Sequence, residues 1–165
     1  MNKERKLNVL VYQDGKEVKI DKKEILKQLG VASLIRIPES EYESIDSSKE
    51  YFAHFNLGHA EHEVGSLYAL PRILRGGKLH GGVETPPLLS FDNIYIAECV
   101  EVEYDLLYEK LEQRHFIFST NGIKDAESLK DAIVRRYSQS RPDYSKEELL
   151  SKGVTFTLLK FVKKI

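Results

Sequence analysis

The chain has 165 residues, of which 41% are hydrophobic and 31% charged, and its formal net charge at pH 7 is −1. This balance is typical of a globular protein of about one domain, and it excludes a chain whose whole surface attracts polyanions. No apolar run approaches the roughly 20 residues that span a bilayer, and the first residues lack the apolar core of a signal peptide. We therefore expect a cytoplasmic protein. The single cysteine, Cys99, agrees with a reducing compartment and is expected to be a small buried residue in a strand.

The first elements are predicted from turn and capping residues. Two apolar-rich runs flank Asp14-Gly15, which is a strong hairpin signal. Asp21 followed by Glu24 indicates a capping box, so a short helix should begin there and end near Gly30.

A further strand, ASLIRI, is expected to stop at Pro38. Residues 39–50 are polar and acidic, which predicts a loop or linker. We place a boundary in this stretch, between an N-terminal hairpin, helix and strand appendage (1–50) and a main domain (51–165).

The stretch LPRILRGGKLHGGVETPP, residues 70–87, combines cations with two glycine pairs. Pro71 suits the first turn of a short helix, and Gly76 suits its left-handed end. Paired glycines allow close backbone approach, so this loop and its cations are candidates for a phosphate or diphosphate site. The cations are Arg72, Arg75 and Lys78. The alternative is a helix end followed by a loop with solvated cations.

The middle of the chain predicts alternating short elements. Apolar and polar residues alternate within residues 93–104, which predicts a strand with one solvent-exposed face. Asp105 can cap the helix LLYEKL that follows. HFIFS is predicted as a strand that ends at the turn 121–122. Asp125 can cap the next helix.

The last third predicts two helices and a strand. Three apolar side chains share one face of the helix that follows Asp125. They are Leu129, Ile133 and Tyr137. Ser145 and Glu148 form a second capping box, and a final strand, VTFTLLKFV, follows Gly153. This mixture of short elements predicts an α+β fold.

Four of the five histidines lie close together in the sequence, between residues 54 and 80. They are His54, His59, His62 and His80. On a helix, the spacing of His59 and His62 suits two metal ligands, with Glu61 or Glu63 nearby. A third ligand at a familiar spacing is missing. The alternative is therefore that the histidines cap, hydrogen-bond or face solvent.

A cationic segment near the last helix is a candidate nucleic-acid surface. Its arginines can follow a phosphate backbone while its tyrosines stack on bases. The residues are Arg135, Arg136, Arg141, Tyr137 and Tyr144. The alternative is an exposed helix end with cations near its C-terminus.

Glu147 and Glu148 are candidates for a catalytic carboxylate. A carboxylate stabilises developing positive charge or takes a proton from an attacking group. Because Glu148 lies three residues after Ser145, the alternative is that it caps a helix.

Two stretches resemble the DarT-type DNA ADP-ribosyltransferase toxins. HEVGSLYALPRILRGGKL is similar to the family's histidine motif and early helix, with His62 in about the histidine's place. VEYDLLYEKLEQRHFIFSTNG is similar to the family's strand, short helix and turn. The resemblance covers residues 51–133 by pattern.

The resemblance implies an ADP-ribosyltransferase-like fold, with a mixed, split β-sheet and short helices that holds NAD in a cleft. It implies that His62 contacts the ribose beside the nicotinamide, and that Glu147 or Glu148 stabilises an oxocarbenium-like transition state. The implied contacts to the rest of NAD come from Arg72, Arg75, Gly77 and Lys78. A base in single-stranded DNA is the implied acceptor, reached by Arg135, Arg136, Arg141 and Tyr144.

The leading hypothesis is therefore an NAD-dependent enzyme that transfers ADP-ribose to a nucleic-acid base, with a protein antitoxin or regulator as a further partner. Two departures favour a non-catalytic binding or inhibitor protein with an eroded cleft. His62 is not followed by the family's threonine, and Glu147 and Glu148 lie in a helix-start sequence. A metal-dependent hydrolase is the third hypothesis.

Overall fold

The structure is a computed structural model that describes residues 8–46, 48–76, 79–80, 83–84, 86–120, 122–140 and 144–165. Its strands are β1 (Asn8–Gln13), β2 (Lys16–Asp21), β3 (Ser33–Leu34), β4 (Ile37–Pro38), β5 (Tyr51–Leu57), β6 (Leu67–Arg75), β7 (Leu79–His80), β8 (Val83–Glu84), β9 (Leu88–Leu106) and β10 (Val154–Lys164). Its helices are α1 (Lys22–Leu29), α2 (Glu39–Glu43), α3 (Ala126–Ser140) and α4 (Lys146–Ser151), with 3₁₀ turns at Tyr108–Lys110 and Gln113–His115. No helix in these described ranges has the length and apolarity needed to cross a bilayer.

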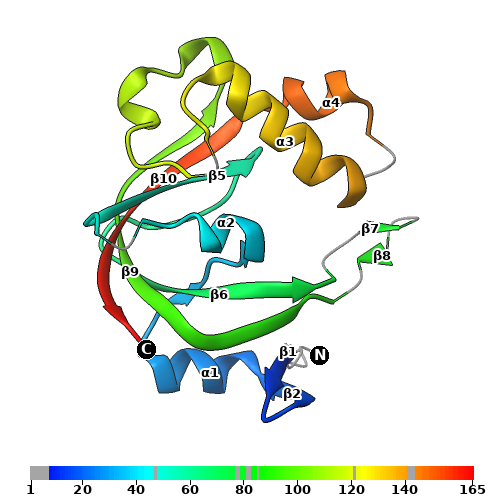
Figure 1. The fold of residues 1–165 in the computed structure, drawn as a ribbon, viewed down its shortest axis with the longest axis vertical. Helices are drawn as coiled ribbons and strands as arrows, with labels where there is room; N and C mark the ends of the chain where they lie inside the picture. The colour runs from blue at the N-terminus through cyan, green and yellow to red at the C-terminus, as the bar shows by residue number, and fades with distance from the viewer. Residues whose placement is uncertain are drawn as a thin grey trace, which may run out of the picture.

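Within the described ranges, eight strands form one mixed sheet (Figure 1). Its main order is β2-β1-β9-β10-β5, and β6 pairs with β9, β3 and β4. Pairing is parallel between β1 and β9 and between β6 and both β3 and β4, and is antiparallel elsewhere. The predicted α+β class, with a mixed sheet and short helices, is confirmed.

Strands from both sides of residue 50 join this sheet. β1 pairs with β9, and β3 and β4 pair with β6. The boundary between 1–50 and 51–165 stays a prediction, but backbone hydrogen bonds cross it in several places.

The strand β9 is the central strand of the sheet, because in the described part of the chain it pairs with three other strands. It runs for 19 residues and pairs with β1, β6 and β10, with register shifts in the latter two ladders. Figure 1 shows it curving along the molecule from the hairpin end to the helical end. It begins earlier and ends later than the predicted strand 93–104.

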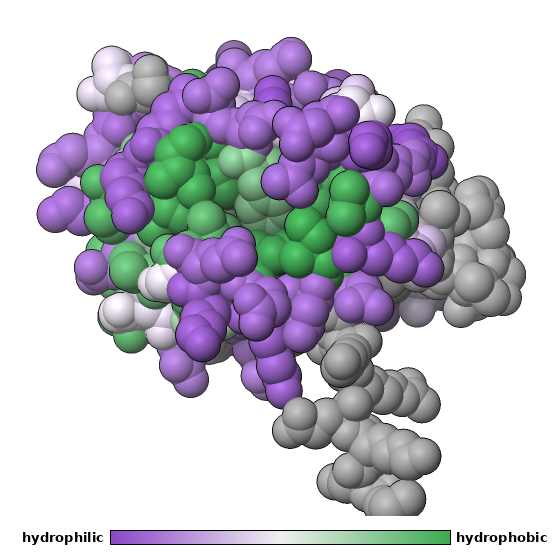
Figure 2. All heavy atoms as spheres, turned by 90° about the horizontal axis from the view of Figure 1, so that it is seen from below, coloured by the Kyte–Doolittle hydropathy of each residue, from purple (hydrophilic) through white to green (hydrophobic). Residues whose placement is uncertain are grey.

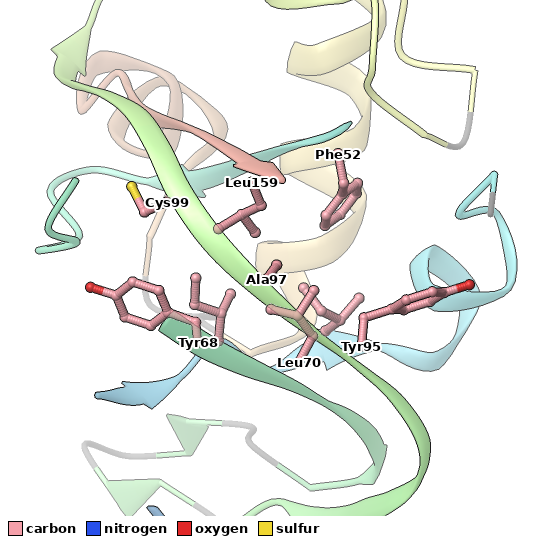
Figure 3. Packing of buried hydrophobic residues seen from close by; sticks show 9 residues of the cluster. Phe52, Tyr68, Leu70, Tyr95, Ala97, Cys99 and Leu159 are labelled. Carbon is pink, nitrogen blue, oxygen red and sulfur yellow. The ribbon is translucent and has the colours of Figure 1, made fainter. Parts of the chain in front are cut away.

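Three buried clusters lie against this sheet in the described ranges, and the two larger ones fill most of the space around it. In the first, side chains from β5, β6, β9 and β10 meet (Figure 3). Its members are Ile35, Ile37, Phe52, Tyr68, Leu70, Tyr95, Ala97, Cys99 and Leu159. In the second, Leu129 and Ile133 of α3 pack against Phe55 and Phe156 of the sheet. Cys99 is fully buried in a strand, as predicted.

Several elements confirm their capping and turn signals. Asp14 and Gly15 form the turn between β1 and β2. The Asp21 side chain accepts from Lys23 N at the start of α1, so the helix start is confirmed but the predicted capping box with Glu24 is not formed, and Gly30 ends the helix. Asp125 Oδ1 accepts from Ser128 N at 2.7 Å, at the start of α3. The capping box of Ser145 and Glu148 opens α4, and the final strand follows as β10.

The predicted helix at Pro71 is wrong, because residues 67–75 form the strand β6. The β6–β9 register shifts between Leu70 and Arg72, at Pro71. Proline is tolerated in a sheet at such a bulge, because it has no N–H to donate to the ladder. Gly76 does have the expected left-handed backbone, with a φ of 84°.

The predicted strand HFIFS is also wrong, since it forms part of a 3₁₀ turn and the turn after it. The main-chain N–H of Glu112 donates to His115 Nδ1 at 2.9 Å, and this bond closes the backbone locally. The predicted helix LLYEKL is a short 3₁₀ turn, because β9 extends through Leu106. Of the predicted loop 39–50, the first residues form α2.

Candidate functional site

A cavity of about 490 Å³ lies between α2, β5 and α3. Its apolar lining includes Ala53, Phe55, Leu129, Ala132 and Ile133. Its polar lining includes Ser40, Glu41, Thr120, Arg135 and Arg136. The volume falls within the range of roughly 300–1,000 Å³ that small-molecule sites occupy. An apolar wall with a few convergent polar groups is also typical of such sites, so this cavity is the candidate functional site.

The local sequence explains how the wall forms. Side chains alternate along a strand, so Ala53 and Phe55 of β5 face α3, whereas His54 packs with Phe52 on the other face. On α3, Arg136 follows Ile133 by three residues and therefore lies on the same helix face.

Glu41 is the central charged group of the site, and its side chain is 12% exposed. Its Oε1 lies 3.1 Å from Nδ1 of the fully buried His54, and its Oε2 lies 3.4 Å from Nη1 of Arg136. Burial alone would raise the pKa of Glu41, but the charges of His54 and Arg136 and the His54 hydrogen bond outweigh it. The pKa is therefore lowered, and the carboxylate is ionised at neutral pH.

Two buried polar atoms of this region lack a hydrogen-bond partner among the described residues. One is the hydroxyl Oγ1 of Thr120, a residue that lines the cavity, and the other is Nε2 of His54. Because a carboxylate only accepts, Nδ1 of His54 donates to Glu41, and this bond leaves Nε2 as the unpaired ring atom. Buried polar groups of proteins are nearly always satisfied, so an unpaired hydroxyl on a residue of the cavity wall marks a polar group that a water or a bound molecule could satisfy after a small side-chain rotation.

Arg135 brings a second positive charge to the cavity. Its side chain is exposed, and its Nε donates to the main-chain oxygen of Asp131 at 3.4 Å. No carboxylate of the described part of the chain forms an ion pair with it. With Arg136 balanced by Glu41, Arg135 makes the cavity attractive to an anion.

The two predicted catalytic glutamates lie elsewhere. The Glu148 side chain accepts from the main-chain N–H of Ser145 at 3.2 Å, so the capping alternative is confirmed for this residue. Glu147 lies exposed in the same first turn of α4. Neither is among the described residues that line the cavity.

His62 also lies outside the described lining of the cavity. Its Nδ1 lies 2.8 Å from Oγ1 of the buried Thr157, and its ring meets Tyr68 edge-on at 5.4 Å between centroids. Burial first, and the charge of His54 second, lower the pKa of His62 to about 4. The ring is therefore neutral at pH 7. The neighbouring His59 stacks on Tyr104 instead, and its Nδ1 lies 3.3 Å from Asp105 Oδ2.

The predicted phosphate-binding cations have partners within the protein. Arg72 Nη2 donates to Ser90 Oγ at 3.3 Å, and the guanidinium lies 5.4 Å from the ring centroid of Tyr42. Arg75 forms an ion pair with Glu17. The predicted ligands Gly77 and Lys78 lie outside the described residues.

The predicted nucleic-acid residues are only partly brought together. Arg135 and Arg136 line the cavity, whereas the Tyr144 ring lies 5.0 Å from Lys152 Nζ, beside α4. Arg141 lies outside the described residues.

In the described ranges, no three side chains of His, Cys, Asp and Glu come together in a way that could hold a metal ion.

The sequence interpretation missed Glu41, Thr120 and the role of His54. Glu41 lies in a stretch read as a loop, and Thr120 in one read as the end of a strand. A usable signal was present at His54, because it occupies an inward position of the apolar strand YFAHFNL, where a histidine needs a polar partner.

Comparison of the chain with protein-family models, with curated proteins and with solved structures found no match.

Proposed function

We propose that the protein binds a small organic anion that has an apolar part, in the cavity between α2, β5 and α3, and does not chemically change it. The observation that carries this proposal is that Thr120, with its unpaired hydroxyl, and Arg135 both line a cavity of about 490 Å³.

The polar lining supports an anionic ligand. Arg135 lacks an ion-pair partner in the described part of the chain, and a guanidinium binds carboxylates and phosphates through two parallel hydrogen bonds. The Thr120 hydroxyl donates to an anion oxygen. Glu41 holds Arg136 and His54 in place, so it fixes the wall of the site rather than repelling the ligand.

The apolar lining supports a ligand with a ring or short aliphatic part. Phe55, Leu129 and Ile133 present apolar surface to the cavity. Burying apolar ligand surface there gains about 25 cal/mol per Å² before the costs of association. A nucleoside monophosphate and an aromatic carboxylate both combine these two chemical features.

Isothermal titration calorimetry of the full chain tests the proposal with AMP, ADP-ribose and benzoate as probes. We expect at least one probe to bind. Arg135→Ala should weaken its binding roughly tenfold to a hundredfold, because a hydrogen bond to a charged group contributes roughly 1.5–3 kcal/mol. Lys124→Ala is the matched control, since it removes an exposed positive charge outside the described lining and should leave the affinity unchanged. Equal effects of the two variants would contradict a site at Arg135.

A second candidate is NAD-dependent transfer of ADP-ribose to a base in single-stranded DNA, on an ADP-ribosyltransferase-like fold that a protein antitoxin or regulator controls. The observation in its favour is that the cavity holds an ionised carboxylate, Glu41, beside two arginines. An oxocarbenium-like transition state needs the carboxylate, and a diphosphate needs the cations. In this proposal Glu41 takes the role that the resemblance gives to Glu147 or Glu148.

Intact-mass analysis of short single-stranded DNA and RNA oligonucleotides, incubated with the protein and NAD, tests the transfer. Addition of one ADP-ribose unit by the parent and by a Glu147→Ala, Glu148→Ala variant, but not by a Glu41→Gln variant that circular dichroism shows to be folded, would support Glu41 as the carboxylate. A combined loss in His62→Ala and the Glu147, Glu148 variant would return the role to the residues of the resemblance. If a probe binds but no ADP-ribose is transferred, only the first proposal, ligand binding without catalysis, is supported.

A further inference from the structure

The strand β2 lies at one end of the sheet order, and within the described residues its strand partner is β1. Its first four residues, Lys16 to Lys19, are exposed. An edge strand of this kind offers a row of unpaired N–H and C=O groups to another strand.

The hairpin register shows which main-chain groups of β2 point outward. Gln13 and Lys16 flank the two-residue turn and face each other, so they form a hydrogen-bonded pair. Orientation alternates along a strand, so the main-chain groups of Glu17 and Lys19 point away from β1. These two residues can therefore pair with a strand on the open side.

The charge pattern of β2 is complementary to itself. When two copies of β2 pair antiparallel about a two-fold axis at Val18, Glu17 of each copy faces Lys19 of the other. Moving the axis by one residue places Glu17 opposite Glu17, or Lys19 opposite Lys19. Opposite charges facing each other across strands are stabilising and like charges are destabilising, so the pattern selects the register centred on Val18.

The surface beside the edge is apolar. A groove of about 140 Å³ is lined by residues that include Val11, Ile20, Ile25, Leu29 and Phe91. Figure 2 shows apolar residues gathered within a polar surround on the face where α1 and the hairpin lie. Tyr12 and Val18 remain 43% and 36% exposed.

We propose that β2 is a self-association edge, at which a second copy of this chain adds its own β2 antiparallel in the register centred on Val18. The sheet then continues through both copies. Val18 of each copy meets Val18 of the other, on the same side of the sheet as Val11. Because one strand pair buries little surface, we expect a weak dimer that forms at high protein concentration.

Sedimentation equilibrium of the full chain tests the register. Lys19→Glu and Glu17→Lys each place like charges opposite each other twice per dimer, so each should weaken association roughly tenfold or more. The double variant Glu17→Lys, Lys19→Glu restores opposite charges between the copies and should associate more tightly than either single variant, although it still lacks the ion pair that Glu17 forms with Arg75 of its own chain. Circular dichroism checks that each variant is folded.

A cysteine cross-link tests the position of the axis. Facing residues in an antiparallel pair have Cα atoms roughly 4.5–5.5 Å apart, which a disulfide can bridge. Val18→Cys should therefore form a covalent dimer under mild oxidation. Val64→Cys is the control, because Val64 is 62% exposed and lies outside the hairpin.

Three results would overturn the proposal. They are a monomeric parent at every concentration, an association that charge reversal leaves unchanged, and equal cross-linking of the Val18 and Val64 variants. A monomeric parent would mean that β2 does not pair with a second copy of this chain. An association that charge reversal leaves unchanged would mean that the copies meet through another surface.

Discussion

At the scale of single residues, replacing Thr120 should raise the stability of the protein and lower its affinity for a ligand. Its buried hydroxyl lacks a partner among the described residues, so Thr120→Val should raise the free energy of unfolding of the ligand-free protein by about 1 kcal/mol. The same change should weaken binding of whichever probe occupies the cavity. Urea denaturation and calorimetry measure the two effects. A loss of stability in the valine variant would mean that the hydroxyl already has a partner in the ligand-free protein.

Glu41 holds together groups from three separate segments. Glu41→Gln leaves His54 and Arg136 without their anionic partner, and breaking a buried pair in this way costs about 3 kcal/mol or more. Glu39→Gln is the matched control, because Glu39 lies on the same helix, is 44% exposed and pairs with Arg72 at 3.9 Å. It should cost less than about 1 kcal/mol. Chemical denaturation of both variants measures the difference.

His62 should make stability depend on pH. Its pKa falls from 6.5 to about 4 in the folded protein, because burial and the charge of His54 disfavour the charged ring. Between these two values the unfolded chain binds the proton and the folded chain does not, so stability falls as pH falls from about 6.5 to about 4. His62→Gln should reduce this slope. Urea denaturation at pH 7, 5.5 and 4.5 tests it, and equal slopes would contradict the assignment.

At the scale of elements, the junction between α4 and β10 depends on Gly153. Its φ is 68°, and an added Cβ would lie 2.6 Å from the main-chain oxygen of Leu106. Gly58 is a matched control, with a φ of 67° and no described atom within 4 Å of its added Cβ. Gly58→Ala should therefore cost about 1–2 kcal/mol from backbone strain alone. Gly153→Ala should cost at least about 1 kcal/mol more, and thermal denaturation compares them.

Elements whose ends carry local hydrogen bonds are predictable from sequence, and elements decided by tertiary pairing are not. Asp21, Asp125 and the pair Ser145 and Glu148 mark helix starts correctly, because each cap is formed within a few residues. Pro71 misleads, since the same residue suits a helix start and a β-bulge. Its environment is decided by β9, a partner that follows later in the chain.

At the scale of the whole molecule, we predict that residues 51–165 do not fold alone. Removing residues 1–50 removes β3 and β4, and with them the buried side chains of Ile35 and Ile37. Burial of each of these two side chains contributes roughly 1.5–3 kcal/mol to the free energy of unfolding. A chain of residues 32–165 keeps these groups and should retain cooperative thermal unfolding, at a lower melting temperature. Cooperative unfolding of 51–165 would instead support the sequence-based boundary.

The cavity could not be predicted from sequence because it is assembled over long distances. Glu41, His54 and Arg136 come from α2, β5 and α3 and meet through the tertiary fold. Local sequence patterns predict the secondary structure of one segment at a time. They do not indicate that these three side chains, from distant segments, come together. The general class of the fold was predictable, because it follows from the balance of short strands and helices.

The position of β10 between β9 and β5 has a consequence for synthesis of the protein on the ribosome. Tyr51 of β5 faces Lys160 of β10, and Leu57 faces Val154. Until β10 leaves the exit tunnel, β5 therefore lacks its strand neighbour, although all its residues have long been made. The nascent chain carries the apolar strand YFAHFNL without this partner while residues 58–153 are made, and such non-local pairing should make folding slow.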